Sequence, residues 1–137
     1  MHALFVIDID DFKNINDNFG HAFGDRVIVE ISETISSIFR DADIVSRFGG
    51  DEFVVFAAHI KDMDFADKKA LELCNTLRKS YGESENKQNI SASVGVACFP
   101  VHGLVYDELF ERADESVYKV KEQGKNGYEI YTAKQEK

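Results

Sequence analysis

Residues 47–53 read Arg-Phe-Gly-Gly-Asp-Glu-Phe and join two short β-prone runs, residues 44–46 and residues 54–56. Two such runs separated by a glycine pair are typical of a β-hairpin. Because glycine lacks a Cβ, the turn can take positive φ angles and another molecule can come close to its backbone. Adjacent strand residues point to opposite faces, so we expect Asp51 and Glu52 to have different roles. The segment predicts a backbone opening for a phosphate or a base, with at least one acid placed for a metal ion.

Composition limits the class of protein. The 137 residues suffice for one domain, and a hydrophobic fraction of 44% with 11 phenylalanines is typical of a folded core. No apolar stretch approaches the roughly 18 residues of a membrane span, and the apolar run near the start is too short for a signal peptide. Cys74 and Cys98 lie in apolar patterns, which favours reduced thiols and a cytoplasmic location.

The formal net charge of -9 bears on the binding partners. Duplex nucleic acid requires a basic surface at its phosphates, so we expect no nucleic-acid partner. With no candidate span, we also expect no membrane contact by this domain. An acidic protein still binds a nucleotide triphosphate when a divalent cation offsets the charge.

Residues 3–9 form a nearly continuous apolar run that predicts a central strand, and acids follow at its end. In an extended chain Asp8 and Asp10 share one face, while Ile7 and Ile9 share the other. A solvated strand end with a helix cap is the common reading of such acids. Open sheets, however, place ligands at strand ends, which favours a functional role here.

Two helices are predicted next, over residues 12–19 and about 25–39, because apolar residues recur at helical spacing in both. We interpret the apolar stripe of the second helix as core. Four polar residues gather around the junction, and each alone is more typical of a cap or turn than of a ligand contact. They are Asn16, Asp17, His21 and Asp25.

After the hairpin the sequence predicts a helix over residues 64–81, capped by Asp64 or Asp67, and a loop over residues 82–89. The side chains of residues 90–99 alternate between two faces, as they do in a β-strand. One face of this strand is small, so we expect another element to pack closely against it. That face consists of Ser91, Ser93, Gly95 and Ala97.

The last predicted helix covers residues 107–123, with Asp107 as its N-cap and Gly124 at its end, and residues 128–131 predict an edge strand. Cations at a helix C-terminus can simply stabilise the helix end. A phosphate-binding role for the lysines there requires the tertiary fold to place them near the candidate site. These are Lys119, Lys121 and Lys125. The order β-α-α-β-β-α-β-α-β predicts an α+β fold, with an antiparallel, hairpin-containing sheet flanked by helices.

As one ordered set, these motifs resemble the GGDEF family of diguanylate cyclases, and the resemblance covers nearly the whole chain. Gly-Gly-Asp-Glu-Phe at residues 49–53 is the family signature, preceded by Arg47 and an aromatic residue. The further matches are Phe-Val-Ile-Asp-Ile-Asp-Asp-Phe-Lys-Asn-Ile-Asn-Asp at 5–17, Phe-Gly-His-x-x-Gly-Asp at 19–25, Ser-x-Ser-Val-Gly-Val-Ala at 91–97, and Ala-Asp-x-x-x-Tyr-x-x-Lys-x-x-Gly-Lys-Asn at 113–126.

The resemblance implies one GGDEF domain over residues 1–137, with a palm-like, ferredoxin-like core akin to that of nucleotide cyclases. It implies condensation of two GTP molecules into cyclic di-GMP with release of two pyrophosphates. A homodimer in which two active sites meet would be required, and an upstream sensory or regulatory domain is implied, so that the full-length protein could be tethered to a membrane.

Roles carried over from the family concern the metal and the chemistry. Asp8, the carbonyl of Ile9 and Asp51 would hold Mg²⁺ or Mn²⁺, ions that prefer oxygen ligands and substrate phosphates. Glu52 would be a further metal contact or the proton acceptor. Lys121 completes the implied catalytic set, together with Asp8, Asp51 and Glu52.

Substrate contacts are implied in the same way. Asn16 and Asp25 would read guanine, with Asp17 and His21 beside them. The backbone amides of Phe12 and Lys13 would bind phosphates. The side chains of Lys121 and Lys125 would do the same, and Gly50 would leave room for the nucleotide.

Arg40 and Asp43 fit the family's product-inhibitory motif, Arg-x-x-Asp five residues before the signature. There cyclic di-GMP stacks on and bonds to the arginine, whose fork suits guanine edges and phosphates. The alternative for an isolated Arg-x-x-Asp is a surface ion pair, worth under about 1 kcal/mol.

Two departures from the family pattern matter. Lys125 stands where many members carry Arg, so we expect a point-charge contact and weaker substrate binding. The usual N-terminal helical segment is absent before the first strand, which would expose apolar area on the sheet. The alternative function is a non-catalytic module that senses cyclic di-GMP or GTP; a scaffold that only dimerises is the third.

Overall fold

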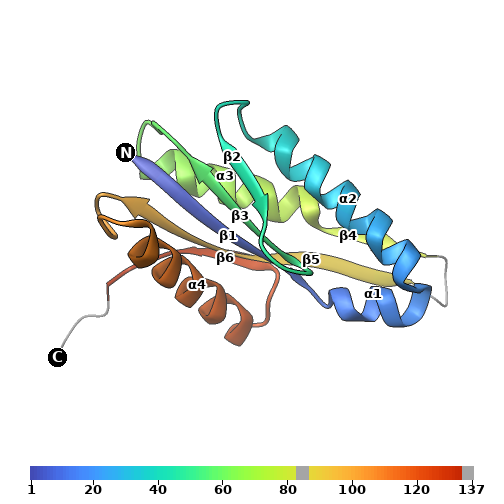
Figure 1. Ribbon diagram of the computed structural model, residues 1–137. Coiled ribbons are helices and arrows are strands. Elements are labelled where there is room, and N and C mark those ends of the chain that lie inside the picture. Colours follow the sequence, from blue (N-terminus) through green and yellow to red (C-terminus); the bar gives the residue numbers. More distant parts are fainter. Residues whose placement is uncertain (83–86, 134–137) are drawn as a thin grey trace.

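In the computed structural model, which describes residues 1–82 and 87–133, six strands form one sheet covered by four helices (Figure 1). The α+β prediction is confirmed, but the sheet is mixed, because the last strand runs parallel to its neighbour. The elements are β1 (His2–Asp10), α1 (Phe12–Phe19), α2 (His21–Ile38), β2 (Ile44–Arg47), β3 (Glu52–Ala57), α3 (Met63–Leu77), β4 (Lys79–Tyr81), β5 (Gln88–Phe99), α4 (Tyr106–Glu122) and β6 (Gly127–Ile130).

Strand β1 occupies the centre of the sheet, whose order is β2-β3-β1-β5-β4, with β6 also beside β5. β1 pairs antiparallel with both β3 and β5. This explains its nearly continuous apolar sequence, since a central strand is covered on both faces. The register sets Asp8 opposite Glu52 on one side and opposite Ser93 on the other.

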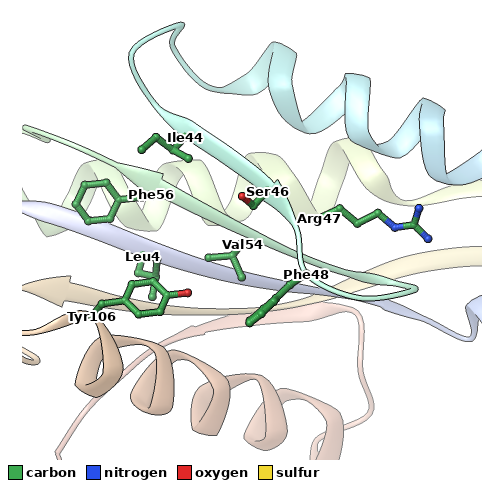
Figure 2. Close-up of a pocket in the computed structure, with 8 residues that line it drawn as sticks. All are labelled: Leu4, Ile44, Ser46, Arg47, Phe48, Val54, Phe56 and Tyr106. Atoms are coloured by element: carbon green, nitrogen blue, oxygen red, sulfur yellow. The ribbon is translucent and has the colours of Figure 1, made fainter.

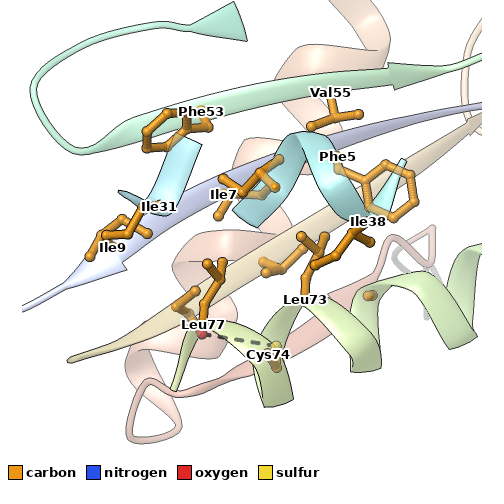
Figure 3. Packing of buried hydrophobic residues seen from close by; sticks show 14 of the residues in the cluster. Phe5, Ile7, Ile9, Ile31, Ile38, Phe53, Val55, Leu73, Cys74 and Leu77 are labelled. Atoms are coloured by element: carbon orange, nitrogen blue, oxygen red, sulfur yellow. Dashed lines mark hydrogen bonds between the residues drawn. The ribbon is translucent and has the colours of Figure 1, made fainter. Parts of the chain in front are cut away.

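The two faces of the sheet bury different residues of β1, as its alternation predicts. Phe5, Ile7 and Ile9 face α2 and α3, together with Phe53 and Val55 of β3 (Figure 3). Leu4 and Val6 of β1 pack with α4 on the other face. Each fully buried side chain of this kind contributes roughly 1.5–3 kcal/mol to the stability of the fold.

Helix α4 approaches the small face of β5 very closely. A Cβ built on Gly95 would lie 1.9 Å from the carbonyl oxygen of Ala113 and 2.8 Å from the amide nitrogen of Val117. Glycine is therefore required at this point, and the prediction of a closely packed element is confirmed. This close contact sets the distance between α4 and β5.

The helix starts differ from the predicted ones. α2 begins at His21, so Gly24 lies inside the helix instead of before it. α3 is capped by Asp62, whose side chain accepts a bond of 2.9 Å from the amide of Phe65, and the predicted caps Asp64 and Asp67 are wrong. The backbone enters the helix at Asp62, which leaves the two later acids on its surface or flank.

The C-terminal half of the chain also departs from the sequence pattern. α3 ends at Leu77, and the next residues form β4, which was predicted as helix. The predicted loop starts at Gly82, but its residues 83–86 lie outside the described part, and β5 begins at Gln88. Helix α4 starts at Tyr106 without a side-chain cap, so Asp107 is a first-turn acid and not the N-cap.

An apolar groove of about 440 Å³ lies on the α4 side of the hairpin (Figure 2). Leu4, Val54 and Phe56 belong to its sheet surface, while exposed Ile44 and exposed Phe48 line it from the outer strand and the turn. Apolar side chains of the hairpin are therefore exposed along this groove. No helix in residues 1–82 and 87–133 is long and apolar enough to cross a bilayer.

The two cysteines are free and lie inside the larger core. Burial raises the pKa of both Cys74 and Cys98 to about 11. Their thiols therefore stay protonated and poorly nucleophilic at neutral pH.

Candidate active site

Three segments that are distant in sequence meet at one end of the sheet: the end of β1, the β2–β3 turn and the start of α1 (Figure 1). The amide of Ile9 donates a hydrogen bond of 2.9 Å to the carbonyl of Asp51, which joins the first two segments. The candidate metal ligands of β1 and of the turn are thus neighbours, as an ion held between them requires.

The turn covers residues 48–51 and is closed through main-chain contacts. The amide of Phe48 donates to the carbonyl of Glu52 at 2.7 Å. The guanidinium of Arg47 donates to the carbonyls of Gly49 and Gly50, at 2.9 and 2.7 Å. Figure 2 shows this arginine extending away from the apolar groove. Arg47 therefore stabilises the turn, a role that its position before the glycines did not indicate.

The glycines of the turn do not use the conformational freedom that they have: neither Gly49 nor Gly50 takes a positive φ angle. A Cβ built at either position meets nothing within 4 Å, and both residues are exposed. What their small size provides is open space beside the backbone. A side chain there would project into solvent and shield the turn from an approaching molecule.

Asp51 precedes β3, which begins at Glu52. The strand-alternation argument for separating the two acids therefore does not apply to Asp51. Glu52 does obey the alternation and shares the α4 side of the sheet with Asp8, its partner in the register. Asp8, Asp51 and Glu52 act on one another electrostatically, because the charges of the first two raise the pKa of Glu52.

Helix α4 brings Lys121 to the end of β1, where its Nζ lies 2.7 Å from Oδ2 of Asp8. Burial raises the pKa of Asp8 and outweighs the lowering by Lys121, and Asp51 and Asp10 raise it further. Burial alone would lower the pKa of Lys121, but the hydrogen bond and charge of Asp8 raise it. The carboxylates of Asp10 and Asp51 add to both shifts, because their negative charges disfavour ionised Asp8 and favour charged Lys121.

Glu52 has a third acidic neighbour, Asp114, which the sequence motifs did not assign to the site. Its pKa is raised first by burial and then by the charge of Asp114 on α4. Asp114 and Lys121 are seven residues apart, which places them on one side of the helix. This spacing is the signal that could have assigned Asp114 to the site.

Asp10 is nearly fully buried, at 2% exposure, and its oxygens accept three hydrogen bonds. The hydroxyls of Ser91 and Ser93 donate at 2.7 Å each, and the amide of Asn126 donates at 3.0 Å. A buried carboxylate is tolerated where such bonds satisfy it. Asp10 thus connects three segments and is not a solvated strand end.

Lys125 reaches the start of α1, with its Nζ 3.0 Å from Oδ1 of Asp11. The first amides of a helix have no partner within the helix, and its N-terminus favours anions. Phe12, which is buried, and Lys13, which is exposed, provide two of these amides. The fold thus places Lys121 and Lys125 at the end of β1. A phosphate-binding role for these lysines requires this position.

At the junction of α1 and α2, Asn16 packs over Gly24. A Cβ on Gly24 would lie only 1.8 Å from Oδ1 of Asn16, so the glycine makes room for this amide. Asp25 follows on the exposed side of α2, which brings the two candidate guanine contacts to one junction. Asp17 and His21 are exposed nearby.

Arg40 and Asp43 form a two-pronged ion pair before β2. Nη2 and Nε of Arg40 lie 3.0 and 3.3 Å from the two oxygens of Asp43, and Nη2 also donates to the carbonyl of Ala58. The Asp43 side chain is 1% exposed, whereas that of Arg40 is 51% exposed. The hydrogen bond and charge of Asp43 raise the pKa of Arg40. One face of an oriented guanidinium is therefore presented to solvent.

The donors at the strand end fit a hard divalent cation. The carboxylates of Asp8 and Asp51 and the carbonyl of Ile9 offer oxygen donors, and the negative charges of Asp51 and Asp10 beside Asp8 favour a cation. Among the described residues, no three acidic, histidine or cysteine side chains converge into a complete cage. Two carboxylates and a carbonyl would fit Mg²⁺ or Mn²⁺, because Mg²⁺ usually takes one or two carboxylates and adds substrate phosphates.

A helix-covered sheet whose central strand ends in acids beside an open glycine turn defines the class of palm-like domains found in nucleotide cyclases. Residues 1–127 match the family described as "Diguanylate cyclase, GGDEF domain", and the chain belongs to this family.

Known relatives agree with this assignment. The chain is 38% identical over 126 residues to the bifunctional diguanylate cyclase/cyclic di-GMP phosphodiesterase MucR of Pseudomonas aeruginosa, covering 92% of this chain and 18% of MucR. It is 36% identical over 129 residues to diguanylate cyclase A of Treponema denticola, covering 90% of this chain and 33% of that protein. The crystal structure of the GGDEF domain of YfiN (TpbB) from P. aeruginosa superposes with a TM-score of 0.88 at 32% identity, covering 97% of this chain and 83% of that one.

Proposed function

We propose that this chain is the catalytic domain of a diguanylate cyclase, which condenses two GTP molecules into cyclic di-GMP and releases two pyrophosphates. The single observation that carries the proposal is the convergence of Asp8, Asp51, Glu52 and Lys121 beside the open glycine turn. A structural role alone does not account for two partly buried acids, Asp8 and Glu52, whose pKa values are raised by burial and by neighbouring carboxylates. Perturbed acids of this kind cluster at functional sites.

The residues at the strand end hold the reacting groups. Asp8, Asp51 and the Ile9 carbonyl would bind Mg²⁺ or Mn²⁺, which neutralises phosphate charge and favours ionisation of the attacking hydroxyl. The 3′-oxygen of one GTP forms a bond to the α-phosphorus of the other, and the bond to pyrophosphate breaks. Glu52 serves as the proton acceptor or as a further metal ligand; its raised pKa favours the first role.

Contacts with the rest of the nucleotide come from the helices. Lys121 and Lys125 bind the phosphates, together with the amides of Phe12 and Lys13. Lys125 acts as a point charge, so substrate binding is weaker than with a two-pronged arginine. At the α1–α2 junction guanine is recognised by Asn16 and Asp25, with Asp17 and His21 at the margin, and Gly50 leaves room for the nucleotide.

Two copies of the domain are needed, because each supplies one GTP and the two sites must face each other. The chain covers only a fifth to a third of the curated relatives described above, so further domains that control the pairing are part of this proposal. Arg40, held in place by Asp43, is the proposed binding site for the product, which would inhibit the enzyme.

The test is to incubate the protein with GTP and Mg²⁺ and to quantify cyclic di-GMP and pyrophosphate by chromatography. Turnover that is lost in Asp51→Asn and retained in Asp41→Asn, a matched exposed acid, supports the cyclase. Omission of divalent cations must have the same effect as Asp51→Asn. Tight binding of cyclic di-GMP without turnover, abolished by Arg40→Ala, would instead indicate the sensing module. No nucleotide binding at all would leave only a scaffold.

A further inference from the structure

The loop between α4 and β6 has an unusual backbone. Gly124, Lys125 and Asn126 have φ angles of 110°, 65° and 54°, three consecutive residues in the left-handed region. Only glycine adopts such angles freely; asparagine tolerates them, and lysine does so rarely. Non-glycine residues stay in this region where neighbouring contacts hold them. The conformation matters because Lys125 is one of the two lysines whose side chains are proposed to bind the triphosphate.

Two contacts from inside the fold hold the loop. The amide of Asn126 donates to Oδ2 of Asp10, the buried carboxylate that also accepts bonds from β5. The amide of Lys125 donates to the carbonyl of Val120 at 3.0 Å. The backbone of the loop is therefore attached both to the end of β1 and to the last turn of α4.

A third contact comes from an element outside the site. Arg78, the residue that ends α3, donates from Nε to Oδ1 of Asn126 at 3.1 Å, and its Nη1 donates to Asn75 at 3.3 Å. Arg78 lines a polar cavity of about 440 Å³ together with Asp11 and Asn126. Arg78 therefore binds the side chain of Asn126 while Asp10 binds its main-chain amide. Because Arg78 is exposed, its removal opens no hole in the core.

We propose that Arg78 is a positioning residue for the triphosphate: with Asp10 it clamps Asn126 and so keeps Lys125 directed at the start of α1. The inference rests on the proposed function for its consequence, but the clamp itself is a property of the free protein. Arg78 has no contact with the acids of the strand end among its described hydrogen bonds. It acts on the substrate only through Asn126 and Lys125.

The variant to make is Arg78→Ala, with Lys79→Ala as the matched control. Lys79 is the adjacent cation and lines the same cavity, but it pairs with Glu30 and not with the loop. Affinity is measured by calorimetry for GMP and for a GTP analogue with a methylene between the α- and β-phosphorus. We expect Arg78→Ala to weaken the triphosphate about three- to tenfold, the effect of one hydrogen bond, and to leave GMP unchanged.

A merely structural role would not produce this difference, because general loosening of the fold weakens both ligands. The double variant with Lys125→Ala should bind the analogue no more weakly than Lys125→Ala alone, since Arg78 acts through that lysine. Unchanged affinity for the analogue in Arg78→Ala, or equal losses for the analogue and GMP, would overturn the inference.

Hydrogen exchange in the nucleotide-free protein separates this inference from the proposed function. The amides of Lys125 and Asn126 should exchange faster in Arg78→Ala than in Lys79→Ala or the unaltered chain. Equal exchange in all three refutes the clamp even where GTP binds. If the unaltered protein binds no GTP, the proposed function fails, and the exchange rates still decide whether Arg78 holds the loop.

Discussion

Gly24 makes room for Asn16, and Gly24→Ala is therefore a precise way to move one candidate guanine contact. The added methyl would lie 1.8 Å from Oδ1 of Asn16 and 3.0 Å from its Cγ. Gly24 lies within α2 and has no positive φ angle, so alanine fits the backbone there. The amide of Asn16 is the end of a movable side chain, and we expect it to give way.

The size of the effect follows from the same distances. An ordinary contact begins near 3.4 Å, so Oδ1 must move by roughly 1.5 Å, which breaks a hydrogen bond to a base. Losing one such bond lowers affinity about three- to tenfold. Alanine gains about 1 kcal/mol of helix propensity over glycine, and a strained rotamer of Asn16 costs about 0.5–1.5 kcal/mol. The melting temperature should therefore change by only a few degrees.

The assay compares binding of α,β-methylene analogues of GTP and ATP by calorimetry, with thermal unfolding followed by circular dichroism. Gly24→Ala should lose affinity for the guanine analogue and leave the weak adenine binding as it was. Ser36→Ala, an exposed change on the same helix, is the control and should alter neither quantity. The double variant Gly24→Ala/Asn16→Ala should bind like Asn16→Ala alone.

Two results would refute this reasoning. Full guanine affinity in Gly24→Ala, with a clear loss in Asn16→Ala, would show that the amide finds another route to the base. A fall of more than about 10 °C in the melting temperature would show that the methyl displaces the α1–α2 packing and not only one side chain.

Three further changes test other parts of the structure. Gly95→Ala places a methyl 1.9 Å from the carbonyl of Ala113 and should destabilise the fold by at least about 1–3 kcal/mol in urea unfolding; a normal midpoint would contradict the close approach of α4. Burial and Asp114 raise the pKa of Glu52, so ionisation of this group costs stability as pH rises through that pKa. Glu52→Gln should therefore have a higher melting temperature than the unaltered chain near pH 8 and the same melting temperature at about pH 3–4. It should also lose turnover. A lower melting temperature near pH 8 would contradict the raised pKa of Glu52. Gly50→Ala should keep its melting temperature, because its Cβ meets nothing within 4 Å, and should bind GTP more weakly; unchanged binding would show that the nucleotide does not approach there.

The sequence predicted the parts of the fold that depend on periodicity. The alternation in β1 and the apolar stripe of α2 identify buried faces, and both faces are as predicted. β4 could not be predicted in this way, because Lys79–Tyr81 is polar, partly exposed and continuous with a helical pattern. It exists as a strand because it pairs with residues 88–90 of β5.

The candidate site was predictable where one short segment contains the signal. The acids at the end of β1 and those after the glycine pair are visible as motifs, and the structure places them at one edge. The burial of Asp10 needs the register that sets it opposite Ser91, which sequence alone does not supply. The contact of Arg78 with Asn126 likewise depends on where α3 ends.

Arg47 holds the glycine turn by two main-chain carbonyls and by none of the turn's side chains. The backbone conformation of the turn therefore does not depend on which acid occupies position 51. Exchanging aspartate for glutamate there would lengthen the side chain by one methylene and leave the backbone of the turn unchanged. Evolution can adjust the reach of this acid toward a metal or a phosphate in single steps, without having to rebuild the hairpin that carries it.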